Sequence, residues 1–298
     1  MSGLLALFFG CSDYNIHGVE DIREPLDPNE RPPMDESEEE EDPIVPGEPV
    51  ADAGPDQTVA PLDLVFLDGT ASYDPDGGDI TKYEWTLVEV PSGSTASILG
   101  TSKDAPSIWM DLAGDYVIEL TVQNDQGEWD STPDEVVISA VPSDGFYVQL
   151  SWDTVTDLDL HLLDGSSRIW DNPGDCNFCN MSPEWGSGGP DDNPSLDWDT
   201  IFEGYGPETI TIDKPRSGST YTALVHYYGE SGSPTCWGQC PPATATIDIY
   251  LSGSVVASFT ETLDDAGATW TAASIEFPSQ TVTEIGTLGK TNDITCDW

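Results

Sequence analysis

Two carboxylates and an imidazole alternate with leucines along one short segment in the second half of the chain. From Asp157 to Leu163 the sequence reads Asp-Leu-Asp-Leu-His-Leu-Leu. Successive side chains of a β-strand point to opposite faces, so Asp157, Asp159 and His161 should share one face while the leucines of the other face enter a core. The sequence therefore predicts a strand that gathers potential metal ligands on a single side.

Carboxylates that point the same way suit a hard cation, because calcium takes several oxygen ligands. The segment Leu-Asp-Trp-Asp at 196–199 repeats the acidic alternation and could add oxygens. We expect a calcium site whose candidate ligands are Asp157, Asp159, Asp197 and Asp199. A solvated acidic strand face is the alternative interpretation.

Histidines offer a second way to hold a metal. His226 lies in Tyr-Thr-Ala-Leu-Val-His-Tyr-Tyr, a strand pattern, and could meet His161 and Asp159 in space. For each histidine we favour a simpler interpretation, a strand imidazole that is hydrogen-bonded to a neighbouring carboxylate. His161 is also a poor ligand for calcium.

Five cysteines lie in the second half of the chain. Cys176 and Cys179 form one close pair, Cys236 and Cys240 form another, and Cys296 is left over. Four thiolates could hold zinc, but outside the cytoplasm disulfides are expected. We predict that the two close pairs are oxidised and pin glycine- and proline-rich loops. Cys296 is either free or paired with one of the four.

Sequence signatures of common enzymes are missing. There is no Gly-x-Ser-x-Gly elbow, no His-Glu-x-x-His and no phosphate-binding glycine loop. A glycosidase with two carboxylates stays open, although the predicted strands are short for such a scaffold. The sequence predicts a protein that is not an enzyme, with an extracellular hydrolase as the least favoured class.

Charge and composition restrict the partners. The 298 residues carry 56 Asp and Glu against 8 Lys and Arg, a formal net charge of -48. Nucleic acid is excluded as a partner because its phosphates would be repelled, and anionic lipid surfaces are disfavoured for the same reason. No stretch shows helical periodicity, and frequent Gly and Pro turns separate short β-prone runs. The expected class is all-β.

The N-terminal region predicts an anchor and a tether. Residues 2–10 are apolar and end at Gly10-Cys11, which resembles the end of a bacterial lipoprotein signal with Cys11 as the lipidated residue. No Lys or Arg precedes this run, so an ordinary signal peptide with an incidental cysteine is the alternative. Residues 12–48 are acidic and rich in proline, which predicts a disordered and extended linker.

The stretch from Ala51 to Val141 carries a set of motifs in order. They are Ala-Asp-Ala-Gly-Pro-Asp-Gln, Leu-Asp-Gly-Thr-Ala-Ser-Tyr-Asp-Pro-Asp-Gly, Tyr-Glu-Trp and Gly-Asp-Tyr-Val-Ile-Glu-Leu-Thr-Val. This order resembles a PKD domain, an immunoglobulin-like β-sandwich of extracellular proteins. The resemblance implies a sandwich over about 49–142 that serves as a spacer or binding module. Trp85 is expected in its core.

A second sandwich is predicted for residues 145–278, followed by a C-terminal tail at 279–298. Its Trp-Asp, Asp-Leu-Asp-Leu-His, Gly-Tyr-Gly-Pro-Glu and Val-His-Tyr-Tyr segments resemble a bacterial secreted domain of uncharacterised function, similar in layout to pre-peptidase C-terminal domains. The resemblance implies a jelly-roll or immunoglobulin-like fold. The aromatic loop over about 171–199 is expected either to bind a sugar or peptide or to pack its own tryptophans.

Together these features predict a secreted protein, lipid-anchored at the outer membrane or cell surface of a Gram-negative bacterium. It would act without catalysis as a binding, adhesion or spacer module for an extracellular protein or polysaccharide. The alternative is a carbohydrate-binding or hydrolase-accessory module that acts on extracellular polymers. Its contact with the membrane would run through the lipid anchor alone.

Overall fold

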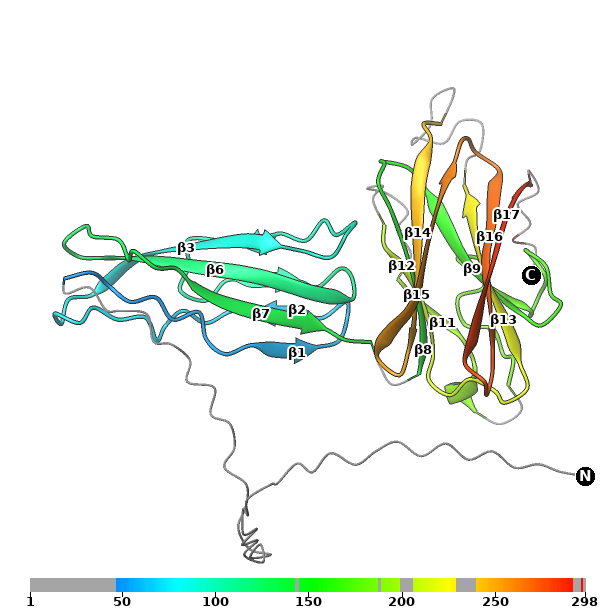
Figure 1. The fold of residues 1–298 in the computed structure, drawn as a ribbon, viewed down its shortest axis with the longest axis horizontal. Helices are drawn as coiled ribbons and strands as arrows, with labels where there is room; N and C mark the ends of the chain where they lie inside the picture. Colours follow the sequence, from blue (N-terminus) through cyan, green and yellow to red (C-terminus); the bar gives the residue numbers. More distant parts are fainter. Residues whose placement is uncertain are drawn as a thin grey trace, which may run out of the picture. The chain divides into compact units, whose positions relative to one another are not determined.

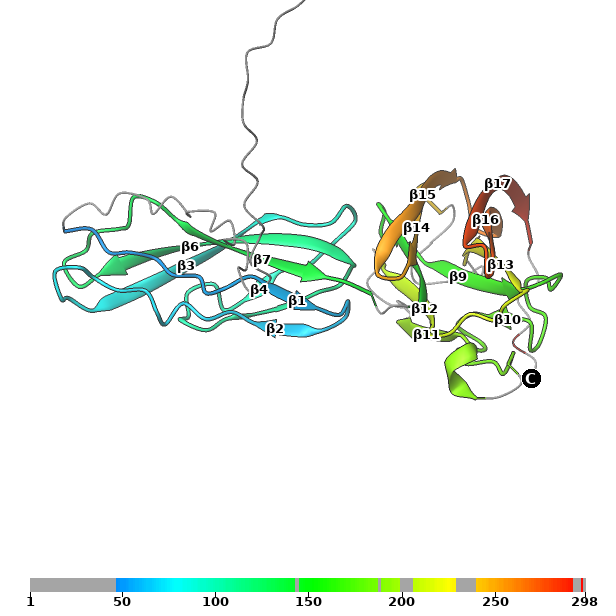
Figure 2. The same ribbon diagram turned by 60° about the horizontal axis from the view of Figure 1, so that its bottom comes forward.

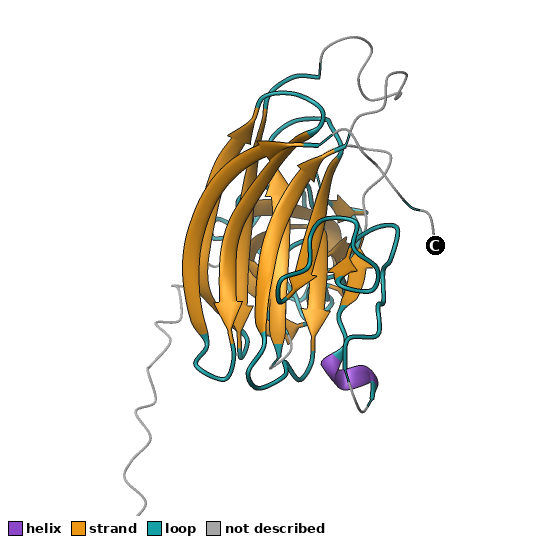
Figure 3. Cartoon of the chain, turned by 90° about the vertical axis from the view of Figure 1, so that its right-hand side faces the viewer, coloured by secondary structure: helices purple, strands orange, loops and turns teal. Residues whose placement is uncertain are grey.

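A computed structural model describes residues 47–142, 145–186, 189–198, 206–228, 240–291 and residue 296. The predictions for Cys11, for most of the 12–48 linker, for Asp199 and for Cys236 lie outside these residues. No helix in the described ranges is long and apolar enough to cross a membrane. Strands dominate, and the single helical element among the described residues is a short 3-10 turn, η1, at Pro190–Asp192 (Figure 3).

The first domain is a sandwich of a four-stranded and a three-stranded sheet (Figure 1). One sheet has the order β1-β7-β6-β3 and the other β2-β5-β4, and β1 runs parallel to β7. The strands are β1 (Gln57–Val59), β2 (Leu64–Phe66), β3 (Ile80–Glu89), β4 (Ile98–Leu99), β5 (Ser107–Trp109), β6 (Gly114–Asn124) and β7 (Asp134–Ala140).

Alternation along the strands builds the core of this domain. On β6 the side chains of Ile118, Leu120 and Val122 are fully buried, whereas their neighbours in sequence are more exposed. Trp85 on β3 is 2% exposed, and its indole N–H donates a hydrogen bond to the Lys103 carbonyl at 2.9 Å. The expected core position of Trp85 is therefore confirmed.

The second domain is a sandwich of two five-stranded sheets, seen as two layers in Figure 2. The sheet orders are β10-β9-β13-β16-β17 and β11-β12-β8-β14-β15, and all pairs are antiparallel. The strands are β8 (Phe146–Trp152), β9 (Leu158–Asp164), β10 (Asp175–Cys176), β11 (Ser195–Trp198), β12 (Glu208–Ile212), β13 (Thr220–Tyr227), β14 (Ala243–Leu251), β15 (Ser254–Leu263), β16 (Ala268–Glu276) and β17 (Thr281–Lys290).

The core of the second domain lies between these two sheets. Leu158, Leu160 and Leu162 of β9 are fully buried there, together with Val148 and Leu150 of β8. The leucine face predicted for residues 157–163 thus points inward, and the acidic face of the same strand points away from the central core.

The structure extends the second domain beyond the predicted end at residue 278. Strand β17 pairs antiparallel with β16, with Thr281 opposite Glu276 at one end and Lys290 opposite Ala268 at the other. Residues 281–290 are therefore an edge strand of the sheet and not a tail. Sequence patterns did not predict this strand, because β17 lacks an alternating apolar face and is exposed along most of its length.

Candidate functional site

Strand register brings Asp159 and His226 together on the outer face of one sheet. The two residues are direct cross-strand partners in the β9–β13 pair. Such partners have Cβ atoms only about 5 Å apart, and His226 Nδ1 lies 3.1 Å from Asp159 Oδ2. His161 is two residues further along β9 on the same face, and its ring centroid is 6.1 Å from that of His226.

The orientation of His161 is set by Asp175. His161 Nδ1 lies 2.8 Å from Asp175 Oδ2, and both side chains have no exposed surface. The backbone N–H of Trp170 donates a second hydrogen bond to the same oxygen, at 2.7 Å. Strand β10 places Asp175 here because it pairs with β9 at Leu162 and Leu163. Both histidines therefore contact carboxylates, as the sequence predicted.

A loop covers this outer face and removes it from water. The ring of Trp170 stands edge-on to His161 at 4.8 Å and to His226 at 5.5 Å. Phe178 packs against Trp170 at 5.8 Å and against Tyr228 at 5.6 Å. As a result His161 is 0% exposed and His226 is 1% exposed, although neither belongs to the central core.

A third carboxylate reaches the cluster from the opposite sheet. Glu208 is the first residue of β12, and its Oε2 accepts a hydrogen bond from the backbone N–H of Leu160 at 2.6 Å. Just before it, Gly206 has φ +80° and lies so close to Trp152 that a Cβ would come within 2.9 Å of the indole. Glycine is therefore required at this approach to β12.

The cluster contains two groups of potential metal ligands. In each, one ligating atom per residue lies within 4.8 Å of the others; the groups are Asp159, His161, His226 and Asp157, Asp159, Glu208. Glu208 and Asp175 were not selected from the sequence. The only signal for Glu208 was its place after the Gly-Pro turn that feeds a strand, and no signal singled out Asp175 among the 56 acids.

Asp197 lies elsewhere, which corrects the expected ligand set. On β11 the neighbouring Leu196 is in the core, so Asp197 lies on the outer face of the other sheet, where Thr211 donates a hydrogen bond to it. Partial burial raises the pKa of the Asp197 carboxyl above its usual value. Strand β11 pairs with β12 in the other sheet, so Asp197 does not join the cluster around Asp159.

Burial also determines the charge of His226. Desolvation, followed by the influence of His161, lowers the pKa of His226 to about 3. The imidazole is therefore neutral at physiological pH, which is the form in which histidine binds metal ions.

The cysteines differ from the predicted pattern. Cys179 forms a disulfide with Cys296, across a sequence separation of 117 residues, and Cys176 is a free, buried thiol. The prediction that Cys176 is oxidised is wrong, because its side chain lies in the apolar core and burial raises the pKa of the thiol. Cys240 is disulfide-bonded, as expected.

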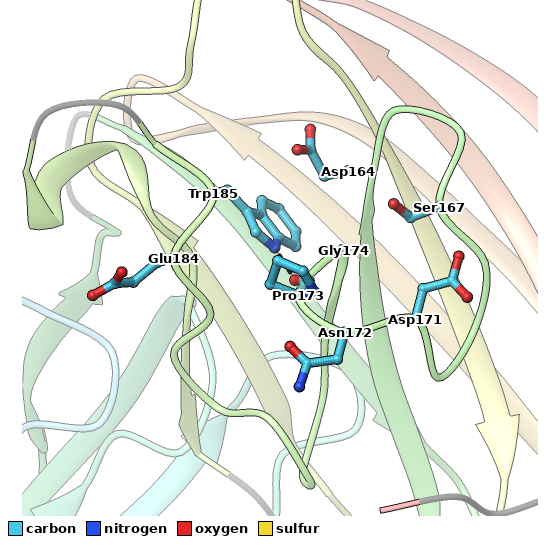
Figure 4. Close-up of a pocket in the computed structure, with 8 residues that line it drawn as sticks. All are labelled: Asp164, Ser167, Asp171, Asn172, Pro173, Gly174, Glu184 and Trp185. Atoms are coloured by element: carbon cyan, nitrogen blue, oxygen red, sulfur yellow. Dashed lines mark hydrogen bonds between the residues drawn. The ribbon is translucent and has the colours of Figure 1, made fainter. Parts of the chain in front are cut away.

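A pocket of about 380 Å³ opens beside the covering loop (Figure 4). Its lining residues are Asp164, Ser167, Asp171, Asn172, Pro173, Gly174, Glu184 and Trp185. Trp185 is 8% exposed, stacks on Tyr221 at 5.8 Å and donates its indole N–H to the Pro173 carbonyl. The aromatic loop thus packs Trp185 into the domain and at the same time frames an acidic, open pocket.

Comparison with known proteins supports part of this architecture. Residues 53–139 match the family described as K319L-like, PKD domain. No curated protein matches the chain.

Solved structures with similarity include the PKD domain from KIAA 1837 protein, at 25% identity and a TM-score of 0.27. The alignment covers 33% of this chain and 92% of the chain of that PKD domain. A nucleoside hydrolase-related hypothetical protein from Saccharophagus degradans, associated with carbohydrate metabolism, is 25% identical, with a TM-score of 0.27 and coverage of 31% of this chain and 25% of its own. A Photobacterium 2,6-sialyltransferase is 15% identical, with a TM-score of 0.23 and coverage of 30% and 18%. This chain thus covers about a quarter or less of the length of these last two proteins.

Proposed function

Residues 53–139 are a PKD domain, and from this premise we propose that the chain is an extracellular, non-enzymatic binding protein. PKD domains are typical of extracellular proteins and are generally not catalytic. In this proposal the first sandwich acts as a spacer, and the second sandwich carries the binding site.

The pocket at residues 164–185 carries the proposal. It lies where loops extend from a rigid β-scaffold, a common location for binding sites. Asp171, Asn172 and Glu184 are exposed side chains that line it and can accept hydrogen bonds. Asp164 is occupied by an ion pair with Arg216 at 2.6 Å, and Asp171 Oδ2 accepts the Arg168 backbone N–H at 2.7 Å, which leaves Glu184 and the second oxygen of Asp171 for a ligand.

The lining favours a neutral, hydroxyl-rich ligand. Carboxylates and an amide beside an indole suit a sugar, whose hydroxyls donate hydrogen bonds to the oxygens. An acidic pocket in a chain of net charge -48 would repel an anionic polymer. We therefore favour a neutral extracellular polysaccharide as partner, and the role of accessory module to a polymer hydrolase is the second candidate.

Attachment to the cell surface belongs to the same proposal. Lipidation at Cys11, followed by the acidic segment to residue 48, would hold the two sandwiches away from an outer membrane. Expression of the full chain in a Gram-negative host should place the protein in the membrane fraction, and Cys11→Ala should release it. Unchanged partitioning of Cys11→Ala would refute the anchor.

Binding to a panel of insoluble and soluble neutral polysaccharides tests the pocket. Glu184→Ala should weaken binding about fivefold, the loss of roughly 1 kcal/mol from one hydrogen bond, and Asp171→Asn, which keeps one acceptor oxygen, should weaken it less. Asp264→Asn is the matched control, because Asp264 is an exposed acid outside the pocket. If the pocket variants bind like the control, the site is wrong. Turnover of any polymer by the intact protein would overturn the non-enzymatic assignment.

A further inference from the structure

Asp159, His161 and His226 form a compact donor set inside the second domain. They come from two paired strands, and each has a ligating atom within 4.8 Å of the other two. Their exposed fractions are 3%, 0% and 1%. Two imidazoles and a carboxylate, brought together by register and shielded from water, are an uncommon combination in a spacer or binding domain.

One atom of this set lacks a partner. His161 Nε2 is buried and has no hydrogen-bond partner among the described residues, whereas the other ring nitrogen is held by Asp175. Buried polar atoms are nearly always satisfied, so an exception needs an explanation. Histidines that bind metals donate one ring N–H to a carboxylate and present the other nitrogen to the ion. The Asp175–His161 pair has this arrangement.

We propose that Asp159, His161 and His226 bind a first-row transition-metal dication of the zinc type. Zinc–ligand bonds of about 2.0–2.1 Å in a tetrahedron place neighbouring donor atoms about 3.3 Å apart. Asp159 Oδ2 and His226 Nδ1 are already 3.1 Å apart, so both can turn to one ion with little movement. The fourth position would fall to Asp157, which has a carboxylate oxygen within 4.8 Å of one of Asp159.

The donor set selects this class of ion over calcium. Imidazole nitrogen suits zinc and its neighbours, whereas calcium takes six to eight oxygens. Calcium, the cation expected from the sequence, would instead use the carboxylate group Asp157, Asp159 and Glu208. Both ions would need Asp159, so the two sites exclude each other. The covered position of the set fits a closed, structural metal site, not a catalytic one.

Zinc competition against a chromogenic chelator tests the site in the full chain. The protein is first unfolded with chelator and then refolded with limiting Zn²⁺, since a buried site loads most easily during folding. One Zn²⁺ per chain should bind, and His161→Gln and His226→Gln should each weaken binding at least tenfold. His17→Gln is the matched control, because it is the remaining histidine and lies outside the second domain. Folded His161→Gln and His226→Gln proteins that bind like the control would overturn the proposal.

Co²⁺ on the wild-type protein keeps the test decisive if those variants do not fold. Visible d–d bands without thiolate charge transfer support nitrogen and oxygen ligands, whereas thiolate bands would assign the metal to cysteines and refute the site. Absence of stoichiometric uptake of Zn²⁺ and Co²⁺ would also refute it. If Ca²⁺ alone stabilised the protein, and this effect were lost in Asp157→Asn but kept in His226→Gln, the zinc site would be wrong. The metal site would then be the one formed by Asp157, Asp159 and Glu208.

Discussion

His161 on β9 and Asp175 on β10 form a fully buried imidazole–carboxylate pair, with Nδ1 2.8 Å from Oδ2. The two residues are 14 positions apart, and the chain between them covers the pair with Trp170. The loop therefore supplies both the carboxylate that orients the histidine and the ring that excludes water from it.

Removal of Asp175 should destabilise the second domain. Asp175→Ala leaves the buried His161 Nδ1 and the partly buried Trp170 N–H without an acceptor, and we expect the free energy of unfolding to fall by about 2–4 kcal/mol. Asp175→Asn keeps an acceptor oxygen and should lose less. Urea unfolding followed by tryptophan fluorescence measures the difference. Equal stabilities of Asp175→Ala and the wild type would contradict the role of this carboxylate.

Glu208 combines a useful hydrogen bond with an unfavourable charge. Glu208→Ala removes the acceptor for the Leu160 N–H and should lower stability by about 1–3 kcal/mol. Glu208→Gln keeps an acceptor and removes one negative charge near Asp157 and Asp159, so in chelator it should be at least as stable as the wild type. Differential scanning calorimetry in chelator compares the three. If Glu208→Gln lowered stability as much as Glu208→Ala, the negative charge of Glu208 would itself be required for stability.

The Cys179–Cys296 disulfide should make a large contribution to stability. A crosslink that spans 117 residues restricts the unfolded chain strongly, and the chain-entropy relation gives about 4–5 kcal/mol as an upper value. Cys296→Ser should therefore lower the melting temperature under non-reducing conditions and not under reducing ones. Peptide mapping should find Cys176 alkylated only after unfolding. A linked Cys176–Cys179 peptide would contradict this pairing.

The carboxyl of Asp248 should make the stability of the protein depend on pH. Burial raises the pKa of its carboxyl in the folded state above the value of about 3.9 in the unfolded chain. The native state therefore binds the proton of Asp248 more tightly than the unfolded state does. The stability that this proton contributes is fully present below the pKa of the unfolded state and is lost as the pH rises through the pKa of the folded state.

Asp248→Asn should consequently stabilise the protein at pH 7, by less than about 1 kcal/mol after solvent screening, and should have no effect near pH 3. Thermal unfolding across this pH range measures the effect. Asp264→Asn, at an exposed acid, is the control for removal of one negative charge. A stabilisation that grows as pH falls would reverse the expected sign.

Local patterns determined much of this protein. The alternation at 157–163 correctly placed the leucines in a core and Asp159 with His161 on the other face, because side-chain direction in a strand depends only on the period of two. The ordered turn and strand motifs likewise predicted a PKD domain over about 49–142, and residues 53–139 match the PKD family.

Contacts between distant segments were decided by the tertiary structure. Asp175 and Glu208 join the cluster through a folded-back loop and through the facing sheet, whereas Asp197, in an equally regular acidic pattern, lies on another surface. Cys296 likewise pairs with Cys179 across most of the domain. Periodicity fixes the face on which a residue lies, but strand order and register fix its neighbours, and these depend on the packing of the whole sandwich.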